Sequence, residues 1–222
     1  MKITNITFGA LRFISGMGRM LFSKSKYRIK PGYRHRATVE PYSDLGAKDE
    51  YQKEVYEKAA QLAKENEFTK IIDIGCGSGY KLIHNMGHLD TMGVDTKETI
   101  EQVRKDYPNY DWLDIDAFNP AEHSADLIIC ADVLEHIADP DSFLKNIISI
   151  KDWKMLLLST PERDLKRGRH HFGPPPNPGH YREWNGKELE AYLSKFVNVE
   201  KREIANEGQG TQMISATPRT SR

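Results

Sequence analysis

Residues 73–80 read Asp-Ile-Gly-Cys-Gly-Ser-Gly-Tyr, with three alternating glycines behind an acidic residue that closes an apolar run. Glycine accepts positive φ and lets the backbone approach a ligand closely. A dinucleotide-binding G-x-G-x-x-G turn would need glycine where Tyr80 stands, and no Gly-Lys-Ser/Thr follows for a P-loop. The pattern therefore indicates a different nucleotide-cradling turn, with a purely structural tight turn as the alternative.

Acidic residues close the next two apolar runs. Asp95 follows Gly75 by about 20 residues, where a carboxylate can accept hydrogen bonds from both hydroxyls of a ribose. Asp114 and Asp116 end the following run, where a carboxylate can accept from an adenine amino group. Each aspartate alone is an ordinary polar strand end. Together they would line the carboxyl ends of consecutive strands, where ligands of open α/β sheets bind.

These residues must be positioned by alternating strands and helices. Strands are expected at 70–74, 91–95, 110–113, 125–130 and 155–159, with a closing pair at 197–199 and 213–216, and helices at 49–66, 79–87, 97–106, 140–149 and 185–195. Asn185 and Glu188 have the spacing of a capping box at the start of the last helix. The order predicts an α/β fold, a Rossmann-like, seven-stranded, mostly parallel sheet with helices on both faces.

Two regions are expected along the chain: an amphipathic arm and lid at 1–48, and the main domain at 49–222. Residues 1–26 carry apolar residues at helical spacing together with basic ones, and residues 27–48 contain prolines and glycines typical of a loop or lid. The arm suits a helix that lies on a membrane surface, on a homodimer mate, or on its own domain.

Composition limits the function classes. The 222 residues contain 32 Lys plus Arg and 32 Asp plus Glu, a neutral balance that disfavours a dedicated nucleic-acid binder. The two cysteines form no CxxC pair, so neither a disulfide framework nor a zinc site is expected, and no metal is predicted. No apolar run is long enough to span a membrane. We expect a cytoplasmic protein, membrane-associated only if the arm binds lipid.

The motifs resemble those of a known family. Residues 72–79 resemble motif I of class I S-adenosylmethionine-dependent methyltransferases, Asp95 matches the acidic residue after their second strand, and residues 125–136, which end in Leu-Glu-His, match their fourth-strand segment. Asp139-Pro140 and residues 158–161 also match the small-molecule branch. The resemblance covers residues 70–161 well and 162–216 more loosely.

The resemblance implies S-adenosyl-L-methionine as cofactor and assigns roles by position. The glycine turn would face the methionine part, Asp95 the ribose, Asp116-Ala117 or alternatively Asp114 the adenine, and the end of the fourth strand the sulfonium. The implied cofactor-binding set is Asp73, Gly75, Cys76, Gly77, Gly79, Asp95, Asp114, Asp116, Ala117, Cys130, Ala131 and Asp132.

The acceptor side is less defined. A hydroxyl acceptor needs help to lose its proton, and His136 or His180 is the expected catalytic base, since histidine titrates near neutral pH. The proline-rich segment 161–184 is expected above the cofactor, with Arg169, Tyr181, Arg182 and Trp184 as acceptor-binding residues. Its ending resembles methyltransferases of saccharide and lipid pathways. The Asn/Asp-Pro-Pro-aromatic stretch of nucleic-acid amino-methyltransferases is absent after the fourth strand.

The sequence thus predicts methyl transfer to a small, anionic or glycosyl acceptor, most specifically O-methylation of a sugar or lipid-linked compound, with no nucleic-acid partner. The alternatives are a non-catalytic cofactor-binding subunit and a methyltransferase with a protein or RNA acceptor.

Overall fold

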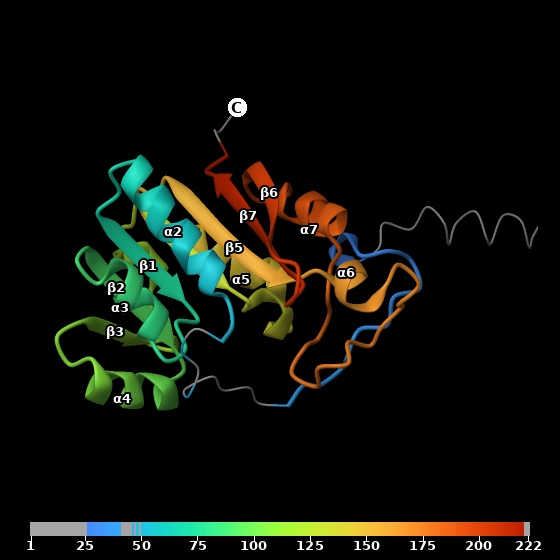
Figure 1. The fold of residues 1–222 in the computed structure, drawn as a ribbon, viewed down its shortest axis with the longest axis horizontal. Helices are drawn as coiled ribbons and strands as arrows, with labels where there is room; N and C mark the ends of the chain where they lie inside the picture. Colours follow the sequence, from blue (N-terminus) through green and yellow to red (C-terminus); the bar gives the residue numbers. More distant parts are fainter. Residues whose placement is uncertain (1–25, 41–45, 47, 49, 220–222) are drawn as a thin grey trace, which may run out of the picture.

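A single mixed sheet organises the chain. The computed structural model describes residues 26–40, 46, 48 and 50–219. Within them the sheet has seven strands in the order β3-β2-β1-β4-β5-β7-β6 (Figure 1). The strands are β1 (Lys70–Ile74), β2 (Asp90–Asp95), β3 (Asp111–Asp114), β4 (Leu127–Ala131), β5 (Met155–Pro161), β6 (Asn198–Asn206) and β7 (Thr211–Thr217). β1 to β5 are parallel and β7 runs antiparallel to both of its neighbours, which confirms the predicted fold class.

Helices connect the parallel strands. They are α2 (Lys53–Glu65), α3 (Tyr80–Met86), α4 (Lys97–Asp106), α5 (Pro140–Ile147), α6 (Arg163–Arg167) and α7 (Gly186–Leu193), with short 3-10 turns η1 (Lys26–Arg28), η2 (Pro120–Glu122) and η3 (Leu134–His136). The predicted capping box forms at α7, where the Asn185 side chain and Glu188 exchange hydrogen bonds with each other's backbone. α6 is an addition to the expected elements, because the sequence predicted only a loop there.

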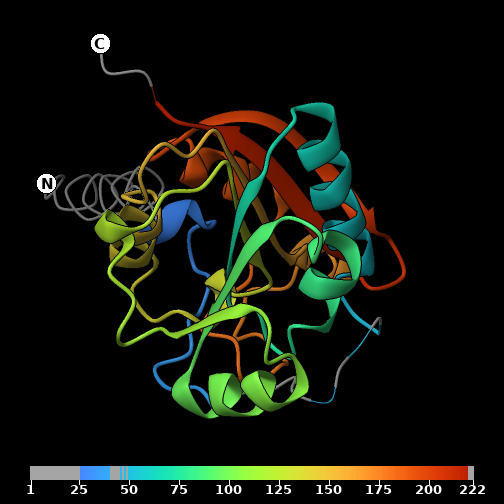
Figure 2. The ribbon, with the colours of Figure 1, turned by 90° about the vertical axis from the view of Figure 1, so that its left-hand side faces the viewer.

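Each face of the sheet has its own apolar core. Side chains of α2, α3 and α4 pack with one set of strand residues, and those of α5 and α7 pack with the alternate set. Viewed from the β3 edge, α2 and α3 lie on one side of the sheet and α5 on the other (Figure 2). The alternation follows from the period of two along a strand, which sends neighbouring side chains to opposite faces.

Residues 27–40 of the predicted lid pack against the proline-rich segment. The Arg34 and Arg36 backbone N–H groups donate to Phe172 O and Tyr181 O at 2.8 and 2.9 Å. Ile29 is 1% exposed and belongs to the α5/α7 core. This segment therefore holds the 170–182 loop in place. The predicted arm at 1–26 lies outside the described residues except for Lys26.

Among the described residues, no helix combines the length and apolar character that crossing a membrane would require.

Asp126 ties the amino ends of three strands together. Its Oδ2 accepts from the Thr69 and Lys70 N–H groups at 2.8 and 3.0 Å, and its Oδ1 lies 2.8 Å from Lys154 Nζ. Burial acts to raise the pKa of Asp126, but Lys154 and the two backbone donors outweigh it and lower the pKa from 3.8 to about 2.

We expect Asp126→Ala to lower the free energy of unfolding by about 1–2 kcal/mol at neutral pH, because two N–H donors and one ammonium lose their acceptor. A carboxylate with a lowered pKa stabilises the fold above its unfolded pKa, so the difference from wild type should shrink as pH falls from 5 towards 2. Denaturant unfolding at several pH values measures this, with the exposed Asp111→Ala as control. A difference that does not change with pH would contradict the assignment.

Candidate functional site

The glycine turn closes β1 against β2. Gly75, Gly77 and Gly79 have φ of 79, 53 and 69°, a region that other residues rarely adopt. The Gly75 and Cys76 N–H groups donate to Val94 O at 2.7 and 3.2 Å. A Cβ at Gly75 would overlap the Val133 side chain. Position 75 therefore needs glycine for both conformation and space, and positions 77 and 79 favour it for conformation.

Asp95 holds this turn from the end of β2. Its Oδ2 accepts from Gly77 N at 2.9 Å and its Oδ1 from Thr96 N at 2.7 Å. A carboxylate offers about four acceptor sites, so each oxygen can take a further donor. Asp73, fully buried, accepts from Tyr56 Oη at 2.8 Å. The arrangement fits a ribose diol beside bare backbone, as the implied cofactor requires.

The two adenine candidates differ in their surroundings. Asp114 Oδ1 accepts from Asp116 N at 3.0 Å and so fixes the turn after β3. Asp116 and Ala117 are exposed. Asp114 is therefore committed in part to the protein's own backbone, whereas the Asp116 carboxylate faces solvent.

The chain turns sharply where β4 ends. Cys130 and Ala131 are buried, and Asp132 follows with φ of 54°. Asp132 N donates to Ser159 O, and Ser159 Oγ donates to Asp132 Oδ1 at 2.6 Å. Burial raises the pKa of Asp132, although the hydrogen bonds from Ser159 and Gln52 oppose that shift. The turn and its partner on β5 fix this carboxyl group at the carboxyl end of the sheet.

His136 and His180 meet although they lie far apart in sequence. Their ring centroids are 4.6 Å apart and the rings are nearly perpendicular. His136 Nδ1 is 2.8 Å from Gly179 O, and His180 Nδ1 is 3.0 Å from Glu183 Oε1. Burial and the neighbouring His180 lower the pKa of His136 from 6.5 to about 4, against the effect of Gly179, so His136 is neutral at neutral pH.

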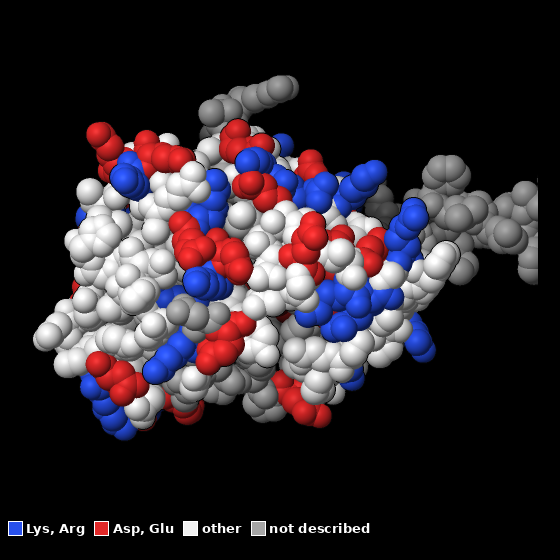
Figure 3. All heavy atoms as spheres, viewed as in Figure 1, with Lys and Arg blue, Asp and Glu red and all other residues white. Residues whose placement is uncertain are grey.

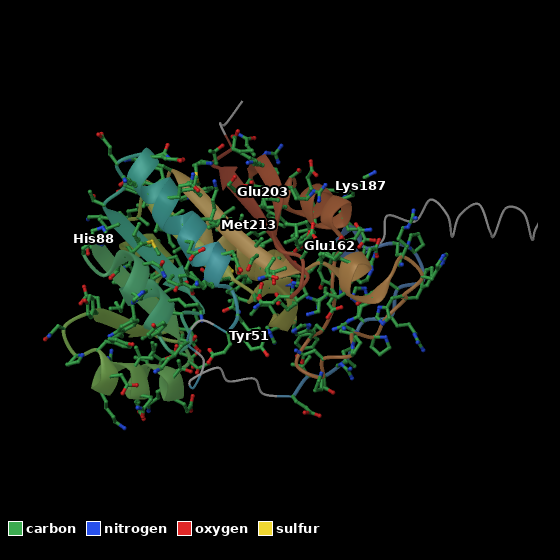
Figure 4. All side chains as sticks on the ribbon, in the orientation of Figure 1. Tyr51, His88, Glu162, Lys187, Glu203 and Met213 are labelled. Carbon is green, nitrogen blue, oxygen red and sulfur yellow. The ribbon has the colours of Figure 1, made fainter. Side chains whose placement is uncertain are left out.

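Both histidines line a pocket of about 570 Å³. Its wall consists of Tyr51, Gln52, Asp132, Glu135, His136, Pro161, Lys166, Asn177, His180, Gly208, Gln209 and Thr211. Tyr51 is 55% exposed and precedes α2 (Figure 4). No local motif in the sequence marks Tyr51 or Gln52, whereas Lys166 is one of the basic residues of the 161–184 segment that could meet a phosphate or carboxylate. Ser159 and Glu135 lie inside the quoted motifs but received no role.

The predicted acceptor-binding residues separate into two pairs. Trp184 is fully buried, donates from Nε1 to Tyr27 O at 3.0 Å and stacks on Tyr192. Arg182 is 3% exposed and donates to Ile137 O and Ala138 O at 2.6 and 2.9 Å. Contacts within the protein occupy both side chains, so we leave them out of the acceptor site that we propose.

Arg169 and Tyr181 remain accessible in whole or part. Arg169 is exposed, and Tyr181 is half-buried with its N–H bonded to Glu135 O at 2.8 Å. Lys and Arg side chains gather around α6 on the surface shown in Figure 3, and α6 itself supplies Lys166 and Arg167. This positive surface adjoins the pocket through Lys166, which lines it.

Comparison with known proteins identifies the domain. A family model described as a methyltransferase domain matches residues 47–196, more than half of the chain. Ubiquinone biosynthesis O-methyltransferase of Coxiella burnetii is 32% identical over 106 residues, which cover 43% of this chain and 45% of that protein. The chain thus spans less than half the length of the curated relatives it matches.

Solved structures share the fold at low identity. The methyltransferase domain of bacterial CtHen1-C aligns with a TM-score of 0.60 and 19% identity, over 76% of this chain and 99% of that one. Magnesium protoporphyrin IX methyltransferase from Synechocystis PCC 6803, solved with bound S-adenosylhomocysteine, aligns with a TM-score of 0.58 and 15% identity over 76% and 84%.

The family model spans the glycine turn, Asp95 and the turn after β4, all of which lie at the carboxyl edge of the parallel strands. The chain therefore belongs to the class I S-adenosylmethionine-dependent methyltransferases.

Proposed function

We propose that the protein transfers the methyl group of S-adenosylmethionine to a hydroxyl oxygen of a small acceptor held in the pocket beside Asp132. The observation that carries the proposal is this pocket of about 570 Å³, which begins at the residue following β4 and is lined by titratable groups. Its volume lies in the range of small-molecule sites. The Coxiella relative is named an O-methyltransferase, and the Synechocystis neighbour is named for a porphyrin, which agrees with a small acceptor.

The cofactor would lie along the edge formed by β1, β2 and β4. Gly75, Gly77 and Gly79 would accommodate its methionine part and Asp95 its ribose hydroxyls. Cys130, Ala131 and Asp132 would border the sulfur. The cofactor supplies a methyl group on cationic sulfur, so the protein's task is to align a nucleophile with it and exclude competitors.

The acceptor would be a sugar or a lipid-linked compound, as the sequence indicates. Tyr51 offers an exposed ring at the pocket, and Lys166 offers a positive charge for an anionic acceptor. The hydroxyl must lose a proton as its oxygen attacks, and His136 and His180 are the predicted bases. A histidine with a pKa of about 4 takes a proton from an alcohol weakly, so His136 suits accepting a hydrogen bond from the hydroxyl better than removing its proton outright.

Asp95→Ala should weaken S-adenosylmethionine binding about 10- to 100-fold, because a carboxylate that accepts from ribose hydroxyls and from Gly77 N is lost. Isothermal titration with the cofactor and with S-adenosylhomocysteine measures this. Asp90→Ala, at the opposite end of the same strand, is the matched control. Equal affinity of wild type and Asp95→Ala would remove Asp95 from the cofactor site.

Asp116→Ala should weaken cofactor binding several-fold and leave thermal stability close to wild type, because its exposed carboxylate is the one available to an adenine amino group. Asp114→Ala should lower thermal stability instead, because it fixes the turn through Asp116 N. Parallel titration and thermal melts separate the two. The reverse pattern would reassign the adenine contact to Asp114.

Label from methyl-labelled S-adenosylmethionine should enter the small-molecule or lipid fraction of a cell extract with wild-type protein, and a panel of hydroxylated saccharides should gain one methyl by mass. Incorporation only into protein or RNA would overturn the proposed acceptor class. Tight cofactor binding without any turnover would favour the non-catalytic alternative.

A further inference from the structure

Three side chains with metal-ligating atoms converge on one wall of the pocket. Glu135 and His136 come from η3, and His180 comes from the proline-rich segment before α7. One ligand atom from each lies within 4.8 Å of the other two. Side chains that converge from separate segments to this distance can share a single ion.

Glu135 is the least satisfied member of this group. It is fully buried, and neither carboxyl oxygen has a hydrogen-bond partner in the described part of the chain. The ionisable groups that act on it most strongly are Asp132 and Glu183, which are also acidic. A buried carboxyl among carboxyls is unfavourable unless it is protonated or paired with a cation. The carboxyl also lines the pocket, where a cation can reach it.

Both imidazoles are oriented as metal ligands usually are. Gly179 O, 2.8 Å from His136 Nδ1, and Glu183 Oε1, 3.0 Å from His180 Nδ1, each fix a proton on Nδ1 and so place the lone pair on Nε2. A carboxylate or carbonyl behind the imidazole is the usual outer support of a ligating histidine. His180 Nε2 currently accepts from Asn177 Nδ2 at 3.0 Å, and an ion would replace that amide.

We propose that Glu135, His136 and His180 bind a divalent cation, with Asp132 as the neighbouring carboxylate on the same pocket wall. Two imidazoles and a carboxylate without sulfur suit Mn²⁺, Fe²⁺ or Zn²⁺ better than Mg²⁺ or Ca²⁺. The sequence predicted no metal from its cysteine pattern, and adjacent Glu135-His136 with the distant His180 match no local ligand spacing that could have revealed this group. The fold supplies the third ligand.

The role of the ion rests on the proposed O-methylation, whereas its binding does not. The ion would lie in the pocket beside Asp132, where it would bind the acceptor oxygen and lower the pKa of the acceptor hydroxyl. The O–H bond breaks and its proton passes to water. The oxygen lone pair forms the new O–CH₃ bond, and the S–CH₃ electron pair stays on sulfur. In this reaction the bound ion promotes loss of the proton, so His136 does not need to act as the base.

The test uses the full chain without a histidine tag, stripped with a chelator and titrated with Mn²⁺. Loss of the free-ion electron paramagnetic resonance signal gives stoichiometry and affinity, and Zn²⁺ is added as competitor. We expect one Mn²⁺ per chain, displaced by Zn²⁺. Glu135→Gln and His180→Asn should each bind at least 10-fold more weakly. The matched controls are His88→Asn and Glu203→Gln, whose positions are labelled in Figure 4 away from Tyr51, and both should bind like wild type.

The outcomes separate the two proposals. Absence of a stoichiometric site, or equal Mn²⁺ binding by Glu135→Gln and wild type, overturns the metal site. Glu135→Gln keeps the shape of the side chain, so a thermal melt like that of wild type would show that weaker Mn²⁺ binding does not come from misfolding. His180→Asn changes the side-chain shape and could not show this alone. Stoichiometric binding that the variants abolish supports the site even if no acceptor is methylated, and then only the proposed function fails. If chelator-treated protein methylated the acceptor at an unchanged rate, the ion would have no role in the reaction.

Discussion

The carboxyl edge of the sheet, where we propose that the ligands bind, depends on the close approach of two turns, one after β1 and one after β4. Gly75 faces Val133 so closely that a single added methyl would overlap it. β1 and β4 are hydrogen-bonded neighbours in the sheet, so their carboxyl ends must emerge side by side. This adjacency puts the backbone of the glycine turn next to Asp132, and with it the proposed methyl donor next to the proposed acceptor. Any residue larger than glycine at 75 would separate the two halves of the site.

A second constraint fixes the acceptor side. Arg163 is fully buried and paired with Glu188 and Asp164, and Trp184 is fully buried beneath residues 26–40. Breaking a buried ion pair by removing one partner is costly, so this anchor strongly favours a single arrangement of the segment. His180 lies only a few residues before Trp184, so the same anchor also limits where His180 can lie. Trp184, which the sequence offered as an acceptor contact, and the buried Arg163 thus help to place the histidine that lines the pocket.

The fold was largely readable from sequence because its signals are local. The alternation of short apolar runs with segments of helical periodicity predicted a mostly parallel sheet. The spacing of Asn185 and Glu188 predicted a helix start that the structure confirms. Element ends shifted by a few residues, and α6 went unpredicted because its five residues lie in a charged, proline-flanked stretch without an apolar stripe. The signals for the proposed cofactor side were equally local, since Gly75, Asp95 and Asp132 each lie at the end of one strand.

The acceptor side could not be read in the same way, because its residues come together only through tertiary packing. A tryptophan or arginine in a loop looks the same in sequence whether it faces a ligand or the core, and the difference here is the cover provided by Tyr27 and its neighbours. Glu135 shows the converse. Its position in the Leu-Glu-His stretch is local, but its unpaired burial and its approach to His180 appear only in three dimensions. A buried carboxyl with two supported imidazoles is costly to maintain for structure alone, so the cluster is best explained by chemistry at the pocket.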